Sequence, residues 1–413
     1  MELQQIKTYC APLCDRMSYR MYKKYEQFLI NLREADSLIS LLPGSDLGSL
    51  RKRDIFELIC NEMSNNLNWK LVEINLSDNN FKYECLKTLG ESLKNNTTLT
   101  SLILDENFYF MTEDEFDYFE TNRIGYDGLK CIIDSLCSNT TLTNLSLKLN
   151  GLSLDEIRLI SEFLKKNKTL LELNLSSNLL DSSRDYYGFE DQYGIHNEHN
   201  GFYYLVEGLK HNTTLTSLNL SQCSIYGKEN CFQLLFDELK TNSSLTKIDL
   251  SKNKLTSKNI AQLCDVLKVN THLNELNLSE LGGLLSKLSI YNDPSLNKLL
   301  CDVLKTNISL TKLILKDAPS SCYPSVIINA LNLSEVLKVN TTLAYLDLSN
   351  TYIKKEGLKV ICDALTTNTT LTYLNISDRS MNTEENVNII NEMLKQNTTL
   401  TKLDIEPVYN FQR

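Results

Sequence analysis

The pattern L-x-x-[LI]-x-[LI] constrains the fold of this chain more than any other feature of its sequence. It occurs eleven times, and its copies begin at Leu71, Leu99, Leu142, Leu170, Leu215, Leu245, Leu273, Leu310, Leu343, Leu371 and Leu400. Successive copies are separated by 28, 43, 28, 45, 30, 28, 37, 33, 28 and 29 residues, so the basic unit has 28 residues and several units carry extra sequence. A fixed period in this range is typical of a solenoid of stacked repeats.

Each repeat divides into a strand and a helix. The L-x-L portion alternates apolar and polar residues, which predicts a short strand with one buried face. About ten residues later, an apolar pattern of helical period begins, as in "YIKKEGLKVICDALTTN" (352–368). Asparagine stands three residues before every copy, from Asn68 to Asn397. Because asparagine tolerates left-handed backbone and bonds its own neighbourhood, we expect it to end the helix and turn the chain into the next strand.

One such unit is too small to bury its own apolar face. Burying a leucine fully contributes roughly 1.5–3 kcal/mol, and this must offset about 1–2 kcal/mol per residue for ordering the backbone. Stacked units share their apolar faces, so that the strands form a parallel sheet and the helices cover its back. The sequence therefore predicts an α/β architecture that is stable only as a stack.

The repeat L-x-x-L-x-L-x-x-N-x-L, with its helical second half, resembles the leucine-rich repeat family, and more narrowly its ribonuclease-inhibitor-like class. The resemblance covers residues 68–405 and implies a curved solenoid of about 11 repeats, with strands on the concave face and helices on the convex face. It also implies that an asparagine after each strand bonds the backbone of adjacent turns. Asparagine occupies this position at Asn79, Asn107, Asn150, Asn178 and Asn253, and Cys223 and Thr351 replace it. Leu281, Ala318 and Arg379 depart from the pattern, so less regular loops are expected there.

Residues 1–67 lie outside the clear repeat. The stretches 17–42 and 53–63 have the pattern of amphipathic helices, which predicts a helical N-terminal cap, with a separate docking helix as the alternative. Residues 406–413 follow the eleventh strand as a C-terminal tail, in which Tyr409 and Phe411 are expected to fold over the end of the array. Dimerisation through that end is left open.

Two repeats carry long insertions rich in aromatic and acidic residues. The second repeat has 43 − 28 = 15 extra residues near 105–122, and the fourth has 45 − 28 = 17 near 181–201. Both follow a strand, so we expect the two insertions to leave the solenoid at the same rim. Tyrosine and phenylalanine are favoured at protein interfaces, and an acidic rim suits a partner with a basic patch. The alternative is that these rings only pack on one another and on the rim.

Candidate partner-binding residues come from the insertions and from the open side of the strands. In the insertions they are Phe108, Tyr109, Phe110, Asp114, Phe116, Tyr118, Phe119, Tyr186, Tyr187, Phe189 and Tyr193. On the strands, Tyr345 and Tyr373 occupy the same position of adjacent repeats and form an aromatic pair in an otherwise polar row. A contact patch with Asp347 and Lys316 is one interpretation of this pair, and solvated polar filler is the other.

Composition excludes several other functions. The net charge of −10 disfavours nucleic acid or an anionic membrane as the main partner, and no apolar run reaches the roughly 18 residues of a membrane span. His196 and His199 do not match a metal-binding spacing. Cys264, Cys301 and Cys362 share one position of the repeat, which predicts buried packing thiols. No catalytic residue, metal site or cofactor is therefore expected.

The sequence thus predicts a non-enzymatic protein-interaction scaffold in the cytoplasm. The Asn-, Lys- and Ile-rich composition and the degenerate "NTTLTSLNLS" units resemble leucine-rich repeat effectors of intracellular bacteria such as Legionella, which implies binding of a host protein in the host cytosol. Two alternatives share the repeat class: a Ran-type GTPase-activating protein, testable by single-turnover GTP hydrolysis, and a ubiquitin-ligase substrate adaptor, which needs an F-box-like helical start.

Overall fold

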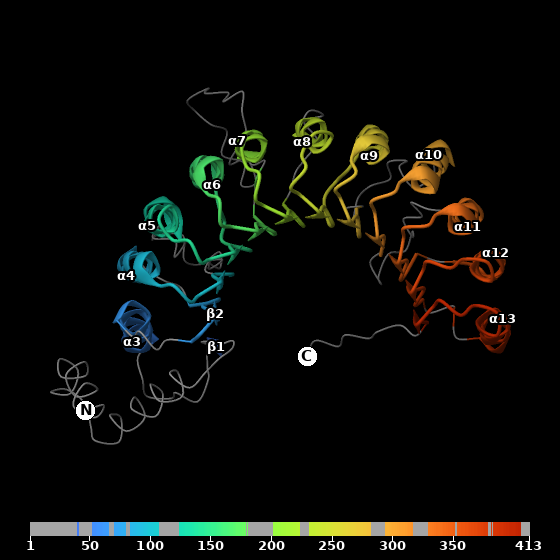
Figure 1. Cartoon of the computed structure of the whole chain (residues 1–413), viewed down its shortest axis with the longest axis horizontal. Helices are drawn as coiled ribbons and strands as arrows, with labels where there is room; N and C mark the ends of the chain where they lie inside the picture. The colour runs from blue at the N-terminus through green and yellow to red at the C-terminus, as the bar shows by residue number, and fades with distance from the viewer. Residues whose placement is uncertain are drawn as a thin grey trace, which may run out of the picture. The chain divides into compact units, whose positions relative to one another are not determined.

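The structure is a computed structural model (Figure 1). It divides into two compact units, Met1–Asn178 and Leu179–Arg413. Each unit is described separately below. The structure describes residues 39–40, 52–65, 70–79, 83–106, 124–178, 180, 201–223, 231–281, 294–316, 329–351, 353–378, 381 and 383–405.

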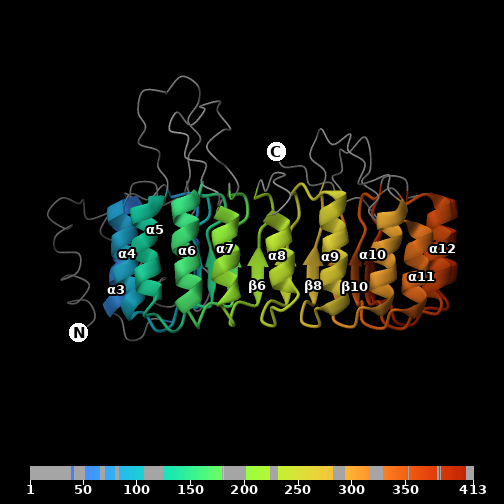
Figure 2. The same cartoon turned by 90° about the horizontal axis from the view of Figure 1, so that it is seen from above.

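The first unit alternates strands and helices from β1 to β5. Its elements are β1 (Ile39–Ser40), α3 (Lys52–Asn65), β2 (Glu73–Asn75), α4 (Tyr83–Asn95), β3 (Ser101–Ile103), α5 (Gly125–Leu136), β4 (Asn144–Ser146), α6 (Leu154–Lys166) and β5 (Glu172–Asn174). The strands pair in parallel and in chain order. The helices lie side by side on one face of this sheet (Figure 1 and Figure 2).

The second unit continues the same alternation. Its elements are α7 (Gly201–Lys210), β6 (Ser217–Asn219), α8 (Cys231–Leu239), β7 (Lys247–Asp249), α9 (Ser257–Val269), β8 (Glu275–Asn277), α10 (Pro294–Thr306), β9 (Lys312–Ile314), α11 (Ala330–Val339), β10 (Tyr345–Asp347), α12 (Lys355–Leu365), β11 (Tyr373–Asn375), α13 (Glu384–Leu394) and β12 (Lys402–Asp404). Each strand pairs in parallel with the next, without a register shift. In both units, the sheet face that the helices leave uncovered is called the open face.

The eleven predicted strands are all present, and the structure adds one more. The helix predicted over 53–63 is confirmed by α3, whose Phe56, Ile59 and Met63 are buried beside α4. The helix predicted over 17–42 is wrong at Ile39–Ser40, where β1 pairs with β2. The reason is tertiary: the first repeat strand offers a free parallel edge, and backbone pairing there overrides the helical period. The rest of this predicted helix, residues 17–38 and 41–42, lies outside the described part.

The core of each unit lies between the sheet and the helices. The central residue of every repeat strand from β2 to β11 is buried, as are the leucines that begin the repeats from Leu71 to Leu371. In the second unit Phe202 of α7 and Phe236 of α8 are fully buried. The ring centroid of Phe232 lies 6.0 Å from that of Phe202 and 5.8 Å from that of Phe236. Phe202 therefore belongs to the core and not to the aromatic insertion that precedes it.

The asparagine before each strand works through its side chain. At Asn270 the helix ends and the chain turns toward the next strand, as predicted, but the backbone is extended, with φ −75° and ψ 123°, and does not use the left-handed conformation that asparagine tolerates. Its Oδ1 accepts hydrogen bonds from the N–H groups of His272 (2.9 Å) and Leu273 (2.8 Å), and its Nδ2 donates to the Leu239 carbonyl of the preceding repeat (2.6 Å). The asparagine thus closes its own corner and ties it to the neighbouring repeat.

Left-handed backbone occurs instead at the opposite turn, where strand passes to helix. Eight residues there have φ between 51° and 59°: Asp78, Glu106, Leu149, Ser177, Gln222, Lys252, Glu280 and Asn350. Each stands directly before the asparagine position of the repeat. The cross-turn bonds implied by the resemblance are confirmed at Asn150, Asn178 and Asn253, which donate to Leu104, Leu147 and Leu220 carbonyls at 3.0, 2.9 and 2.7 Å.

The three expected irregular loops have different outcomes. The turn before Leu281 is regular, because Glu280 keeps φ 53° and its N–H donates to the Lys316 carbonyl at 2.9 Å, as in the other repeats. The apolar Leu281 side chain is buried in place of the asparagine. The turn is thus regular up to Leu281, and the rest of this loop, residues 282–293, lies outside the described part. Ala318 and Arg379 lie outside the described residues.

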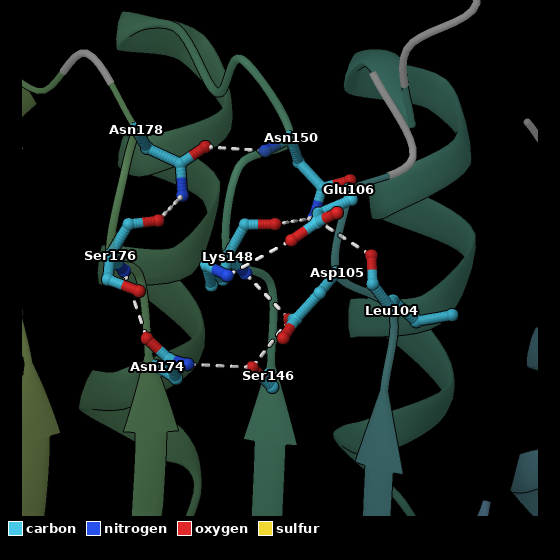
Figure 3. A network of polar contacts seen from close by, with 9 residues as sticks. All are labelled: Leu104, Asp105, Glu106, Ser146, Lys148, Asn150, Asn174, Ser176 and Asn178. Atoms are coloured by element: carbon cyan, nitrogen blue, oxygen red, sulfur yellow. Dashed lines mark hydrogen bonds and ion pairs between the residues drawn. The ribbon is translucent and has the colours of Figure 1, made fainter. Parts of the chain in front are cut away.

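Asp105 replaces a missing turn acceptor in a neighbouring repeat. In most repeats an Asn or Asp at the strand end accepts from the N–H two residues later, as Asn174 does from Ser176 at 3.0 Å. Ser146 lacks that acceptor, and Asp105 Oδ1 instead accepts from Ser146 Oγ (2.5 Å) and from the Lys148 N–H (2.9 Å), as Figure 3 shows. The turn after β4 is therefore closed by the repeat before it.

The pKa of Asp105 is raised by burial, against the lowering effect of the bonds from Ser146 and Lys148. A carboxyl with a raised folded pKa contributes stability below its unfolded pKa and loses that contribution as pH rises through the folded pKa. We expect Asp105→Asn, which keeps an acceptor oxygen without the charge, to be at least as stable as the parent at pH 7, with a difference that shrinks on acidification. Asp105→Ala should cost about 1–3 kcal/mol, because it removes the acceptor of the Ser146 hydroxyl and of the Lys148 N–H. Urea unfolding at pH 3.5 and pH 7 measures both, and an Asp105→Asn variant that is clearly less stable at pH 7 contradicts this assignment.

Candidate protein-binding surface

Eleven of the thirteen candidate binding residues lie outside the described part of the chain. They are Phe108, Tyr109, Phe110, Asp114, Phe116, Tyr118, Phe119, Tyr186, Tyr187, Phe189 and Tyr193. The common rim expected for the two insertions lies outside it as well, so both statements stay predictions.

Tyr345 and Tyr373, the other two candidates, form a stacked pair on the open face of the second unit. They are direct partners in the pairing of β10 with β11. Their ring centroids are 4.1 Å apart and their planes differ by 12°. Both side chains are only partly buried. The register of the repeat therefore brings together two large aromatic groups that keep an accessible edge.

A lysine stands at each end of this stack. Lys312 Nζ on β9 lies 4.9 Å from the Tyr345 ring centroid, and Lys402 Nζ on β12 lies 5.0 Å from that of Tyr373. Ammonium groups at this distance over a ring face are attracted by its π electrons, worth about 0.5–1 kcal/mol at exposed sites. The four side chains thus form one stack across four consecutive strands, in which the outer face of each tyrosine ring contacts a lysine.

Asp404 fixes the hydroxyl end of the stack. Tyr373 Oη donates to Asp404 Oδ2 at 2.6 Å, and Lys402 Nζ lies 3.4 Å from the same oxygen. Partial burial, the bond to Asp404 and the contact with Tyr345 raise the pKa of the Tyr373 phenol. Tyr373 is therefore a neutral hydrogen-bond donor at physiological pH, and its ring position is set by three neighbours.

The row continues along the sheet on the side of β7. Glu275 on β8 contacts Lys247 of β7 at 3.1 Å and Lys312 of β9 at 3.4 Å. Desolvation acts to raise the pKa of Glu275, but the two lysines together outweigh it and the pKa is lowered. The six in-register residues are called the lysine–tyrosine strip: Lys247, Glu275, Lys312, Tyr345, Tyr373 and Lys402.

The next row of the open face serves the fold. Asp347 is 9 % exposed, and its Oδ1 accepts from the Ser349 N–H at 2.9 Å. Asn277 and Asn375 close the turns of their own repeats in the same way, at 3.0 and 2.9 Å. A contact patch that combines the tyrosines with Asp347 is therefore not supported, because the Asp347 carboxylate is buried and accepts a hydrogen bond within its own turn.

Sequence reasoning found the tyrosines but missed the lysines as part of the same site. The signal was present, because Lys312 and Lys402 occupy the same repeat position as Tyr345 and Tyr373. The corresponding row in the first unit has a different character. It contains Glu73, Ser101, Asn144 and Glu172, and Asn144 Nδ2 donates to Glu172 Oε2 at 3.2 Å.

A leucine-rich repeat family model ("Leucine Rich repeat") matches residues 211–227, 241–258 and 339–362, which include three of the strand-to-helix turns described above. Each unit has the fold of stacked leucine-rich repeats. A comparison with curated proteins finds no match.

Two solved structures are similar to this chain over part of its length. One is the leiomodin-1 actin-binding site 2, with 18 % identity over 40 % of this chain and 90 % of that chain, and a TM-score of 0.31. The other is the C-terminal domain of Caenorhabditis elegans tropomodulin, with 14 % identity over 52 % of this chain and 92 % of that chain, and a TM-score of 0.30.

The cysteines at the shared helix position of the leucine-rich repeats are packing residues, as predicted. Cys264, Cys301 and Cys362 are at most 3 % exposed, and burial raises the pKa of each thiol to about 12. Thiols in this environment are poor nucleophiles. Within the described ranges, no group of three or more His, Cys, Asp or Glu side chains is placed to hold a metal ion. The described helices also include none that is long and apolar enough to cross a membrane.

Proposed function

We propose that this chain is a non-enzymatic scaffold that binds another protein, and that the lysine–tyrosine strip of the second unit is a contact surface. The observation that carries the proposal is the stack of Lys312, Tyr345, Tyr373 and Lys402 on the open face. Tyrosine is enriched among the residues that dominate binding energy at interfaces. Here its rings are held before any partner arrives, which reduces the entropy lost on binding.

The acidic aromatic insertions are proposed as a second contact, suited to a basic patch on the partner. At the finer level we propose a ribonuclease-inhibitor-like leucine-rich repeat protein that acts as a bacterial effector on a host protein in the host cytosol. This origin rests on the resemblance of the repeat sequence, and the surface argument stands without it.

Affinity capture with three versions of the full chain tests the proposal. One version is intact, one carries Tyr345→Ala and Tyr373→Ala, and one has residues 108–121 and 184–200 replaced by short linkers. Loss of these two interfacial tyrosines should cost at least about 1.4 kcal/mol of binding free energy. This cost corresponds to at least tenfold weaker capture. Each tyrosine-to-alanine substitution should lower the stability of the fold by only about 0.2–1 kcal/mol, the energy of a cross-strand pair. Circular dichroism checks that the variants remain folded.

Tyr126→Ala is the matched control for this experiment, because Tyr126 lies on helix α5 and is 44 % exposed. It removes an exposed tyrosine away from the strip and should leave capture unchanged. If the double tyrosine variant retains the same proteins at the same affinity as the intact chain, the strip is not a contact surface. If the linker version does so as well, the insertions are not contacts either.

A further inference from the structure

The lysine–tyrosine strip carries a charge opposite to that of the chain as a whole. The chain has a net charge of −10, whereas the strip contains three lysines and one glutamate. We propose that the strip binds an extended acidic segment of the partner, in which a carboxylate, an apolar side chain and a second carboxylate stand at alternate positions. This inference rests on the proposed function and names the chemistry of the partner at that surface.

Lys312 and Lys402 retain hydrogen-bonding capacity for a ligand. Their ammonium nitrogens lie 3.4 Å from Glu275 and from Asp404, longer than the roughly 2.7–2.9 Å of a strong charge-assisted bond. Glu275 is shared with Lys247, and Asp404 also accepts from Tyr373. The Lys402 side chain is 63 % exposed. Carboxylates that approach from the open face therefore each meet an ammonium group whose internal acidic partner is shared with another side chain.

The carboxylates nearest the stack do not repel such a segment strongly. Asp347 is buried and accepts from the N–H of its own turn. Asp404 is held between the Tyr373 hydroxyl and the Lys402 ammonium. On the first unit, by contrast, the same row presents Glu73 and Glu172. The charge complementarity to an acidic segment is thus a property of the strip and not of the repeat.

The spacing of the two lysines selects an extended segment. Lys312 and Lys402 stand on β9 and β12, three strand intervals apart, which is roughly 14 Å at about 4.8 Å per interval. An extended chain rises about 3.4 Å per residue, so side chains four residues apart lie on one face and about 14 Å from each other. The residue midway between them faces the edges of Tyr345 and Tyr373. In a helix, two residues that lie seven apart on one face are separated by about 10.5 Å, which is shorter than the distance between the two lysines.

Fluorescence anisotropy with synthetic peptides and the full unmodified chain tests the inference. The probe is a labelled Gly-Glu-Ser-Leu-Ser-Glu-Gly peptide in low salt. Two comparison peptides replace both glutamates by lysine, or insert one additional serine between leucine and the second glutamate. We expect each change to weaken binding at least tenfold. Equal binding of all three peptides, or no binding of the acidic probe, overturns the inference, and this result does not depend on whether any variant folds.

A charge reversal then places the site. The variant Lys312→Glu with Lys402→Glu should lose binding of the acidic probe at least tenfold. The control variant Lys258→Glu with Lys359→Glu makes the same charge change at exposed positions on helices α9 and α12 and should change binding less than threefold. Equal losses in both variants contradict a site on the strip. If the tyrosine variant loses protein capture while the acidic probe does not bind the intact chain, the proposed function stands and the acidic partner class fails.

Discussion

Asn270→Ala is expected to lower the free energy of unfolding of the second unit by about 3–5 kcal/mol. Asn270 is 4 % exposed, and alanine removes every bond of its side chain. The N–H groups of His272 and Leu273 then lose their acceptor, and the Leu239 carbonyl loses its donor. Each buried group left without a partner costs about 1–3 kcal/mol. The loss also separates two repeats that this side chain joins.

Urea unfolding followed by circular dichroism measures this effect. Asn274→Ala is the matched control, because Asn274 belongs to the same repeat but its side chain is exposed. The control should change stability by no more than about 0.5 kcal/mol. Equal effects of the two substitutions would show that the asparagine before each strand contributes through local backbone preference and not through its side-chain bonds.

Phe236→Ala should cost about 3–5 kcal/mol, the range for truncating a buried aromatic residue. Phe236 is fully buried in α8, and its ring stacks on Phe232 with centroids 5.8 Å apart and planes 23° apart. Phe232 in turn contacts the ring of Phe202 on α7. Alanine therefore leaves a cavity at the junction of two repeats and also removes an aromatic contact, which adds about 0.5–1.5 kcal/mol to area burial.

Leu331→Ala provides the comparison for the core substitution. Leu331 is an apolar residue of helix α11 that is 62 % exposed, so its truncation should change the unfolding free energy by about 0.5 kcal/mol or less. Thermal unfolding of both variants, monitored at the same protein concentration, gives the two values. A Phe236→Ala variant as stable as Leu331→Ala would mean that α7 and α8 do not share a packed core.

The strands and helices of the repeats were predictable because every repeat has the same spacing of apolar residues. Leucines at this spacing bury their side chains only when the repeats stack, so the period identified every strand from β2 to β12. The asparagine before each strand was predicted to end the helix and to bond its own neighbourhood, but its bond to the preceding repeat was not predicted. The sequence shows that asparagine recurs at the repeat position of Asn270, whereas the structure shows extended backbone there and a bond to the preceding repeat. Strand β1 escaped prediction because no repeat pattern marks it and its pairing depends on the edge of β2.

The candidate site was predictable only in part. Tyr345 and Tyr373 stood out because aromatic residues are rare in their row. Lys312 and Lys402 were present in the same row, but their roles depend on distances across strands that a list of residues does not contain. The same holds for Asp404, whose contact with the Tyr373 hydroxyl joins two rows of the open face.

Hydroxyl-radical footprinting of the tyrosines in the free and partner-bound chain tests the central claim most directly. Tyr345 and Tyr373 are partly exposed, so both should be oxidised in the free chain. When a partner protein occupies the lysine–tyrosine strip, their oxidation should fall severalfold, while that of Tyr126 on helix α5 stays the same. Unchanged oxidation of Tyr345 and Tyr373 in a saturated complex would contradict the assignment of the strip as the binding surface.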